Sequence, residues 1–292
     1  MPKHIRPLRQ SHKIALVILI GRVVLCSGAA VANTSLQGGA VVIRLLIGLF
    51  VLSICTLFAV AESINGAESS TKTGTILDHD WAGLEHYRLA NSKTAPPLKG
   101  ENRVVFFGDS ITEFWKLSDY FAGMPYINRG VGGQTTSQML IRFRPDVIAL
   151  SPRTVVILGG TNDILRNHNG AILNVVRDNL SSMVELAQVH SIRVVLASLL
   201  PVNDHSNGKD GKPIRQTVKR RPEDIKILNE WIKKCANDNR LTYLDYYNVM
   251  VDKHGLLWSE LSFDGLHPNK DGYKIMARLA EQAITSSLTS KR

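Results

Sequence analysis

Four short segments, widely separated in the chain, contain side chains of the types that nucleophilic catalysis requires. They read GDSIT at 108–112, NRGVGGQTT at 128–136, GGTND at 159–163 and DGLHP at 264–268. A serine hydroxyl becomes a nucleophile when an imidazole accepts its proton, and a carboxylate holds that imidazole in the required tautomer. Ser110, His267 and Asp264 have these three types, and Asp264 stands three residues before His267 in a turn. Ser110, Asp264 and His267 are therefore candidate catalytic residues.

The position of Ser110, directly after a predicted strand, places it at the turn into a helix. The N–H groups and the dipole at a helix N-terminus favour a negative charge there. The simpler interpretation is that Asp109 and Ser110 cap the helix, as both residue types do routinely. For this segment taken alone, both interpretations remain open.

Glycine-rich turns follow the second and third predicted strands. The three glycines within 130–133 let the backbone come close to a bound group, and Asn162 offers an amide donor to the same crevice. The alternatives are a tight turn for the first segment and an Asx-type cap for Asn162. A phosphate-binding loop is a further alternative, although no Walker-type lysine follows the glycines.

Short apolar runs alternate with helical periodicity from about residue 81 onward. Strands are predicted at 103–107, 126–128, 154–158, 193–199 and 241–246, and helices at 171–190, 223–237 and 272–288. This alternation is typical of an α/β fold with a parallel sheet covered on both faces. Because sites in such sheets form at the carboxyl ends of the strands, we expect the four polar segments to meet at one edge.

The four segments, in this order, resemble the sequence blocks of the SGNH, or GDSL-type, hydrolase family. The resemblance covers residues 81–285, and one departure is Ile111, a packing position where the GDSL name has leucine. It implies a flavodoxin-like three-layer α/β/α sandwich with a five-stranded parallel sheet in the order 2-1-3-4-5. It also implies an oxyanion hole made by the backbone N–H groups of Ser110 and Gly133 and by the Asn162 amide, with no metal and no organic cofactor.

The resemblance implies a serine esterase or acylhydrolase that cleaves carboxylic esters through an acyl-enzyme on Ser110. Its expected partner is a small-molecule, lipid or glycan ester, of the lysophospholipid, thioester or small acyl class. The alternative within the same chemistry is a carbohydrate O-acetyl esterase or acetyltransferase. Two other classes are a binding module with a decayed site, which the four intact segments disfavour, and a nucleotide binder, which leaves Asp264 and His267 without a role.

The first 61 residues have the composition of a targeting region. Apolar stretches at 14–32 and 45–61 follow basic residues, and the second ends Ala59-Val60-Ala61, a signature of signal-peptide cleavage. A cleaved signal at about 41–61, with a true start at Val41 or Val42, is favoured over a membrane anchor retained at 45–61. We expect 1–61 to be the targeting region, 62–80 a polar linker and 81–292 the hydrolase domain. Both interpretations place the domain in the periplasm or outside the cell.

The excess of basic residues lies mostly outside the predicted domain. Residues 1–61 contain six basic and no acidic side chains, which leaves 29 basic against 25 acidic residues, so no nucleic-acid partner is expected. Cys235 is the only cysteine of the predicted domain and is expected to be a buried apolar residue.

The polar segment 202–222 contains six basic residues, Arg220 and Arg221 among them. A solvated surface loop is its simpler interpretation, and attraction of anionic substrates or membrane surfaces is the alternative.

Overall fold

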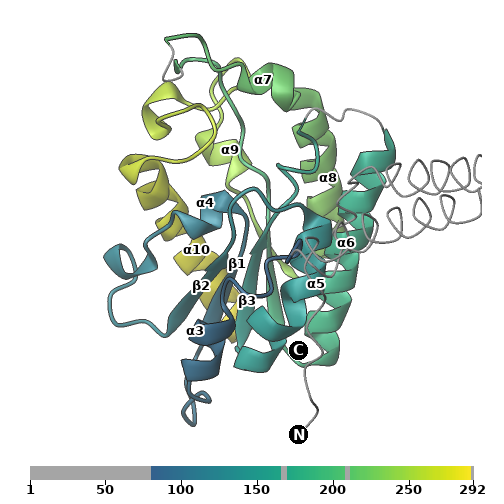
Figure 1. Cartoon of the computed structure of the whole chain (residues 1–292), viewed down its shortest axis with the longest axis vertical. Helices are drawn as coiled ribbons and strands as arrows, with labels where there is room; N and C mark the ends of the chain where they lie inside the picture. The colour runs from purple at the N-terminus through teal and green to yellow at the C-terminus, as the bar shows by residue number, and fades with distance from the viewer. Residues whose placement is uncertain (1–79, 166–169, 208–210, 291–292) are drawn as a thin grey trace, which may run out of the picture. The chain divides into compact units, whose positions relative to one another are not determined.

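The structure is a computed structural model that describes residues 80–165, 170–207 and 211–290 (Figure 1). The predicted targeting region 1–61, with its anchor alternative at 45–61, and the linker as far as residue 79 lie outside the described residues. These assignments and the domain boundaries therefore stay predictions. Within the three described ranges, no helix is both long and apolar enough to cross a membrane.

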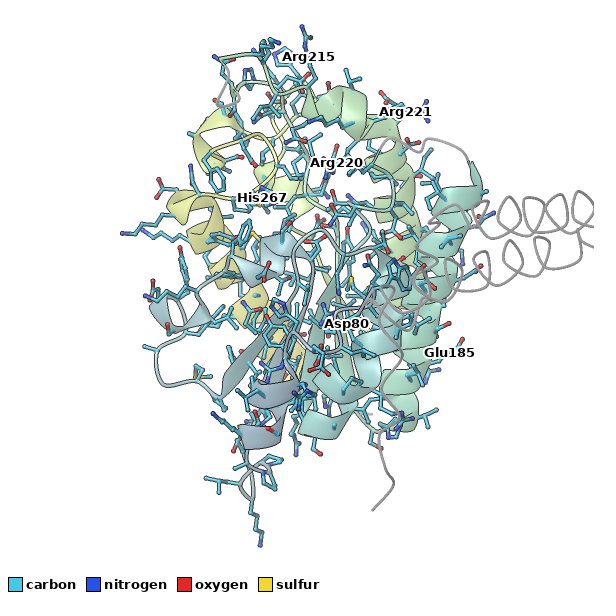
Figure 2. All side chains as sticks on the ribbon, in the orientation of Figure 1. Asp80, Glu185, Arg215, Arg220, Arg221 and His267 are labelled. Carbon is cyan, nitrogen blue, oxygen red and sulfur yellow. The ribbon has the colours of Figure 1, made fainter. Side chains whose placement is uncertain are left out.

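Five parallel strands form one sheet in the order β2-β1-β3-β4-β5, as predicted. They are β1 (Val104–Gly108), β2 (Tyr126–Gly130), β3 (Thr154–Leu158), β4 (Arg193–Ala197) and β5 (Thr242–Leu244). Every residue of β1 and β3 is buried, as expected of strands covered on both faces. The register pairs Gly108 with Gly130 and with Leu158, so the carboxyl ends of three strands lie level. His267 lies at this end of the domain (Figure 2).

Helices cover both faces of the sheet, which confirms the three-layer α/β/α sandwich (Figure 1). On one face lie α5 (Thr136–Asp146), α6 (Gly170–Val189) and α8 (Pro222–Asp238). On the other lie α10 (Lys270–Thr289) and the short α4 (Ser110–Glu113), joined by a 2.8 Å hydrogen bond from Tyr273 Oη to Ile111 O. The remaining short helical segments are α3 (Arg88–Lys93), η2 (Leu117–Asp119), η3 (Ile148–Leu150), α7 (Gln216–Lys219), α9 (Tyr247–Met250) and η4 (Ser259–Leu261).

Among the described residues, the long helices α6, α8 and α10 are those that the apolar periodicity predicts. Each buries a stripe of residues with helical spacing against the sheet. Asn269 caps α10, because its side-chain oxygen accepts from Asp271 N and Gly272 N. Cys235 is buried in α8, and burial raises the pKa of its thiol, which confirms its predicted place in the core.

Two strands end earlier than predicted, because side chains form hydrogen bonds with the backbone just beyond them. β4 ends at Ala197, two residues earlier than predicted, because Leu199 exchanges both backbone hydrogen bonds with the side-chain amide of Asn229. β5 is also shorter than predicted, since Tyr246 N donates to Ser198 Oγ. β2 runs two residues further than predicted, in register with the end of β1.

The buried side chain of Arg142 connects the ends of β1 and β2, next to the first two polar segments. Arg142 lies on α5, a helix that the apolar periodicity did not predict because its buried face carries Arg142 and Asp146. The guanidinium donates to Gly108 O at 2.7 Å and to Arg129 O at 2.9 Å, and it pairs with Asp146 at 2.9 Å. It also donates to the side chain of Gln134. The same guanidinium therefore binds the end of β1, the end of β2 and the glycine-rich loop.

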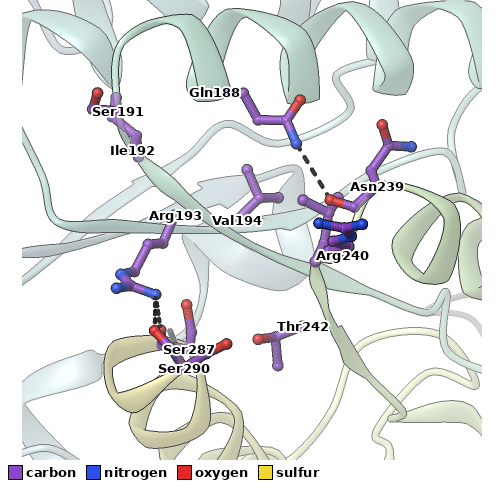
Figure 3. Close-up of a pocket in the computed structure, with 11 residues that line it drawn as sticks. Gln188, Ser191, Ile192, Arg193, Val194, Asn239, Arg240, Thr242, Ser287 and Ser290 are labelled. Atoms are coloured by element: carbon purple, nitrogen blue, oxygen red, sulfur yellow. Dashed lines mark hydrogen bonds between the residues drawn. The ribbon is translucent and has the colours of Figure 1, made fainter. Parts of the chain in front are cut away.

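A cavity lies at the amino-terminal ends of β4 and β5, at the edge of the sheet opposite to the polar segments (Figure 3). On its wall, Arg193 donates to the carbonyl groups of Ser287 and Ser290, and Gln188 donates to Asn239 O. These contacts fasten α10 and α6 to neighbouring segments. No residue of the four polar segments lines this cavity.

We expect Arg142→Met to lower the free energy of unfolding by ~3–5 kcal/mol, because Asp146 would become a buried charge without its ionic partner. Urea unfolding followed by circular dichroism measures the change. The control is Arg88→Met, since Arg88 pairs with Glu85 on the exposed surface and its loss should leave the unfolding midpoint nearly unchanged. Equal midpoints for the two variants would contradict the anchoring role of Arg142.

Candidate active site

Ser110, His267 and Asp264 form a continuous hydrogen-bonded chain at the carboxyl edge of the sheet. Ser110 Oγ lies 2.9 Å from His267 Nε2, and His267 Nδ1 lies 2.6 Å from Asp264 Oδ2. Ser110 follows β1, whereas Asp264 and His267 precede α10, so the fold joins residues 157 positions apart. These distances suit transfer of a serine proton to an imidazole that a carboxylate orients.

The turn 262–268 presents the histidine through hydrogen bonds to its own backbone. Asp264 Oδ1 accepts from Leu266 N at 3.0 Å and from His267 N at 2.7 Å, which leaves Oδ2 for the ring. Gly265 has φ +81°, and a Cβ there would collide with Asn203, whose N–H donates to Gly265 O. The turn therefore requires glycine at this position, and one carboxylate holds both the backbone and the ring of the histidine.

Ser110 is the first residue of α4, a helix of about one turn. Asp109 caps this helix, because its Oδ1 accepts from Ile111 N at 2.9 Å. Only 7% of the Ser110 surface is exposed. The capping and catalytic interpretations of this segment thus apply to different residues: Asp109 caps the helix, and Ser110 contacts the imidazole.

The glycine-rich loop after β2 lies against Ser110. A Cβ on Gly132 would come within 3.8 Å of the Ser110 Cβ. Glu113 Oε2 accepts from Gly132 N at 2.7 Å, and the other carboxylate oxygen lies 3.3 Å from His86 Nε2. Gly133 is exposed, with φ +74°, a conformation that glycine adopts without strain. Because Glu113 occupies the N–H of Gly132, the N–H of Gly133 is the better candidate for an oxyanion donor on this loop.

Asn162 follows β3 and is joined to the same loop. Its Nδ2 donates to Gln134 O at 3.1 Å, and its Oδ1 accepts from Arg220 at 3.2 Å. The neighbouring Asp163 accepts from the backbone N–H and the hydroxyl of Thr136, in the first turn of α5. Asp163 therefore binds the first turn of α5, whose N-cap residue is Thr135, and the two contacts of Asn162 turn its amide nitrogen toward the glycine-rich loop.

Two exposed aromatic rings flank the histidine. Phe263 stacks on His267 with ring centroids 5.9 Å apart, and the Phe114 centroid lies 5.1 Å from that of His267. Phe263 is 61% exposed and Phe114 is 54% exposed, so much of each ring faces solvent. Neither residue is predicted from the sequence, because an isolated aromatic side chain has no periodic signal. The rings therefore place exposed apolar surface beside the histidine.

Two carboxyl groups of the site titrate away from their ordinary range. Partial burial opposes ionisation of Asp264, but the hydrogen bonds from the side chain and backbone of His267 outweigh it, so the pKa of Asp264 is lowered. Burial raises the pKa of Asp109 to about 6, opposed by the hydrogen bond from Ile111 N and by the charges of His267 and Arg220. Asp109 Oδ2 has no hydrogen-bond partner among the described residues. Asp264 is thus an anion at neutral pH, whereas the charge of Asp109 is poorly accommodated.

All five residues predicted for the site lie in segments that meet at this edge. Contacts join Ser110, Asp264 and His267 directly, and the Gln134 carbonyl joins Asn162 to the loop that carries Gly133. Their catalytic roles stay predictions. In the described part of the chain, no group of three or more His, Cys, Asp or Glu side chains could hold a metal ion.

A Ser–His–Asp chain of hydrogen bonds is the arrangement that serine hydrolases use, on several unrelated folds. The chain belongs to the GDSL-like Lipase/Acylhydrolase family, whose sequence profile matches residues 106–275. The predicted family is confirmed, and the protein is an ester-cleaving hydrolase.

Relatives agree with this assignment. The crystal structure of a GDSL-like lipase from Bacteroides thetaiotaomicron is similar at a TM-score of 0.63 and 39% identity, over 70% of this chain and 98% of that one. The isoamyl acetate-hydrolyzing esterase of Saccharomyces cerevisiae is 24% identical over 59% of this chain and 82% of its own length. The acetylxylan esterase of Geobacillus stearothermophilus is 23% identical over 53% and 70%. The chain spans about half (53%) of the Bacillus subtilis protein named uncharacterized lipoprotein YqeF, at 32% identity over 130 residues.

Asp109→Asn tests the buried charge. Because the pKa of Asp109 is raised from 3.8 to about 6, the unfolded chain loses this proton at lower pH than the folded protein does. The stability that the group contributes is complete below about pH 4 and is lost by about pH 6, at a cost of roughly 3 kcal/mol. We therefore expect the unfolding midpoint of Asp109→Asn, relative to the wild type, to rise by several degrees between about pH 4 and about pH 7.

Ser118→Ala, which changes an exposed side chain without charge, is the control for this experiment, and its midpoint relative to the wild type should stay nearly constant over the same range. If the midpoint of Asp109→Asn relative to the wild type also stayed constant with pH, Asp109 would ionise as easily in the folded protein as in the unfolded chain, which would contradict the prediction.

Proposed function

We propose that this hydrolase cleaves carboxylic esters through an acyl-enzyme on Ser110. The observation that carries the proposal is the 2.9 Å contact of Ser110 Oγ with His267 Nε2, continued by the 2.6 Å contact of His267 Nδ1 with Asp264. With the carboxylate ionised, Nδ1 carries a proton and Nε2 is the acceptor that faces the serine.

The first half-reaction forms a new ester on the enzyme. His267 Nε2 takes the Ser110 proton as Oγ attacks the carbonyl carbon, and the carbonyl oxygen becomes an oxyanion. The N–H groups of Ser110 and Gly133 and the Asn162 amide would stabilise this charge, because preorganised donors act most strongly on a charge that develops in the reaction. The oxyanion then collapses, the bond to the alcohol breaks, and His267 returns the proton to the departing oxygen.

The second half-reaction repeats the same steps with water as the nucleophile. His267 takes a proton from water as its oxygen attacks the acyl carbon, and the same donors hold the second oxyanion. When this intermediate collapses, the bond to Ser110 Oγ breaks and the proton passes to that oxygen. The carboxylic acid leaves, and Ser110 is restored.

Small acyl esters are the substrates that we propose. Support comes from two relatives, one named for isoamyl acetate and the other for acetylxylan. The exposed faces of Phe114 and Phe263 beside His267 offer contact to an apolar acyl or alcohol group. A lysophospholipid substrate would instead require a preference for long acyl chains, and a thioester substrate would require a thiol as the leaving group.

The second candidate is a carbohydrate O-acetyl esterase or acetyltransferase, which the relative named acetylxylan esterase favours. The same acyl-enzyme serves all of these reactions. Water as the acceptor completes hydrolysis, whereas a sugar hydroxyl as the acceptor completes transfer. Comparing release of free acetate with acetylation of added sugar distinguishes them.

We expect the full-length protein to hydrolyse p-nitrophenyl esters, fastest with short acyl groups, and Ser110→Ala to reduce kcat at least about 10³-fold. Release of p-nitrophenol from esters of acetyl to palmitoyl measures both effects. Ser118→Ala, which changes an exposed serine outside the site, is the control and should retain the wild-type rate. Equal activity of Ser110→Ala and the wild type would contradict the mechanism, and a maximum at palmitoyl would contradict the proposed substrate class.

A further inference from the structure

The orientation of the Asn162 side chain decides whether it can stabilise an oxyanion. An amide has donors on its nitrogen and an acceptor on its oxygen, and rotation by about 180° exchanges their positions. With Oδ1 turned toward the reacting oxygen, the group would repel the negative charge instead of binding it. A donor that occupies Oδ1 from the other side would prevent this rotation.

Arg220 supplies that donor. Its Nη2 donates to Asn162 Oδ1 at 3.2 Å, and its Nε donates to Thr161 O at 3.0 Å. A guanidinium has only donors, so it binds the oxygen of an amide and never its nitrogen. The contact therefore selects the orientation in which Nδ2 donates to Gln134 O and faces the glycine-rich loop.

The same arginine reaches the opposite side of the site through Gln216. Arg220 Nη1 donates to Gln216 Oε1 at 2.9 Å, and Gln216 Nε2 donates to Asp264 O at 3.2 Å. Both side chains are 5% exposed, and they come from α7 and the residue that ends it. A chain of hydrogen bonds thus connects the turn after β3 with the turn that holds the histidine.

Arg220 also places a positive charge behind the Asn162 amide. Burial lowers the pKa of Arg220, but the carboxylates of Asp109 and Asp264 oppose this shift, and arginine stays protonated in proteins. A charged donor on Oδ1 forms a stronger hydrogen bond than a neutral one and polarises the amide. The N–H groups of Asn162 become better donors as a result.

The adjacent arginine has a different environment. Arg221 donates through Nε and Nη2 to the Asp224 carboxylate at 2.9 Å, and its side chain is 48% exposed. Figure 2 shows Arg220 inside the domain at the same end as His267, with Arg221 and Arg215 nearer the periphery. The attraction of anionic substrates considered for segment 202–222 therefore does not suit Arg220, whose guanidinium binds protein groups.

We propose that Arg220 is a positioning residue that holds the Asn162 amide in the orientation required for the oxyanion. The inference rests on the proposed function, because it assigns Arg220 no contact with the substrate and lets it act only through Asn162. Gln216 supports Arg220 and links it to the turn that carries Asp264.

A double-mutant cycle in the full-length protein tests this role. The variants are Asn162→Ala, Arg220→Gln and the double variant, with Arg221→Gln as the matched control, and kcat and KM are measured with p-nitrophenyl acetate. We expect Asn162→Ala to lower kcat by about 10²–10³-fold and Arg220→Gln by about 10-fold or more, with KM changed less than about threefold. The double variant should match Asn162→Ala within about twofold, because the group through which Arg220 acts is gone. Arg221→Gln should match the wild type.

If the two effects multiply in the double variant, or if Arg220→Gln retains the wild-type kcat, the positioning role is wrong while the proposed function stands. If the wild type itself does not turn over the ester, the proposed function fails and the inference fails with it. Unfolding midpoints are measured for every variant. Should Arg220→Gln not fold, Arg220→Lys takes its place in the cycle, since it keeps the charge but lacks the planar set of donors that reaches Asn162, Thr161 and Gln216 together.

Discussion

The buried guanidinium of Arg142 is the constraint on which the geometry of the site depends. It binds the carbonyl of Gly108 at the end of β1 and the carbonyl of Arg129 in β2, and Asp146 compensates its charge. Because Ser110 stands two residues after Gly108, and the glycine-rich loop follows Arg129, one side chain sets the separation between the serine and that loop. A neutral group could not replace it without leaving Asp146 as a buried, uncompensated charge. A side chain of the core therefore determines how the serine and the glycine-rich loop of the site are placed.

Around that anchor, the glycine-rich loop and the turn after β3 are each held by a side chain from another part of the chain, whereas the turn before α10 is held by its own carboxylate. Glu113, three residues after the serine, holds the N–H of Gly132, and Arg220 holds the side chain of Asn162. The carboxylate of the C-terminal turn holds both the backbone and the ring of the histidine. Donors fixed in this way need little reorganisation when negative charge develops, which is the condition for strong electrostatic stabilisation. The exposed rings of Phe114 and Phe263 lie beside the histidine at the surface.

The sequence predicts those parts of the molecule that depend on periodicity and local spacing. The β-branched run of β3 and the apolar stripes of α6, α8 and α10 are read directly, and the pairing of Asp264 with His267 follows from their separation in one turn. Helix α5 escapes prediction because buried Arg142 interrupts its apolar face. The role of Arg220 is not predicted, because the sequence does not distinguish it from the other basic residues of segment 202–222, and only the fold shows that it is buried. The early end of β4 is not predicted either, because it depends on Asn229, which lies in α8. The features that the sequence does not predict are contacts between residues far apart in the chain.

Covalent labelling with a fluorophosphonate tests whether Ser110 is the nucleophile of this ester hydrolase, because the reagent stays attached to the serine that attacks it. The protein is labelled, digested and mapped by mass spectrometry, and the remaining esterase activity is measured on the same sample. We expect one phosphonyl group, on the peptide that contains Ser110, with activity lost in proportion to labelling. Loss of activity with the label on another residue, or full activity after complete labelling of Ser110, would contradict it.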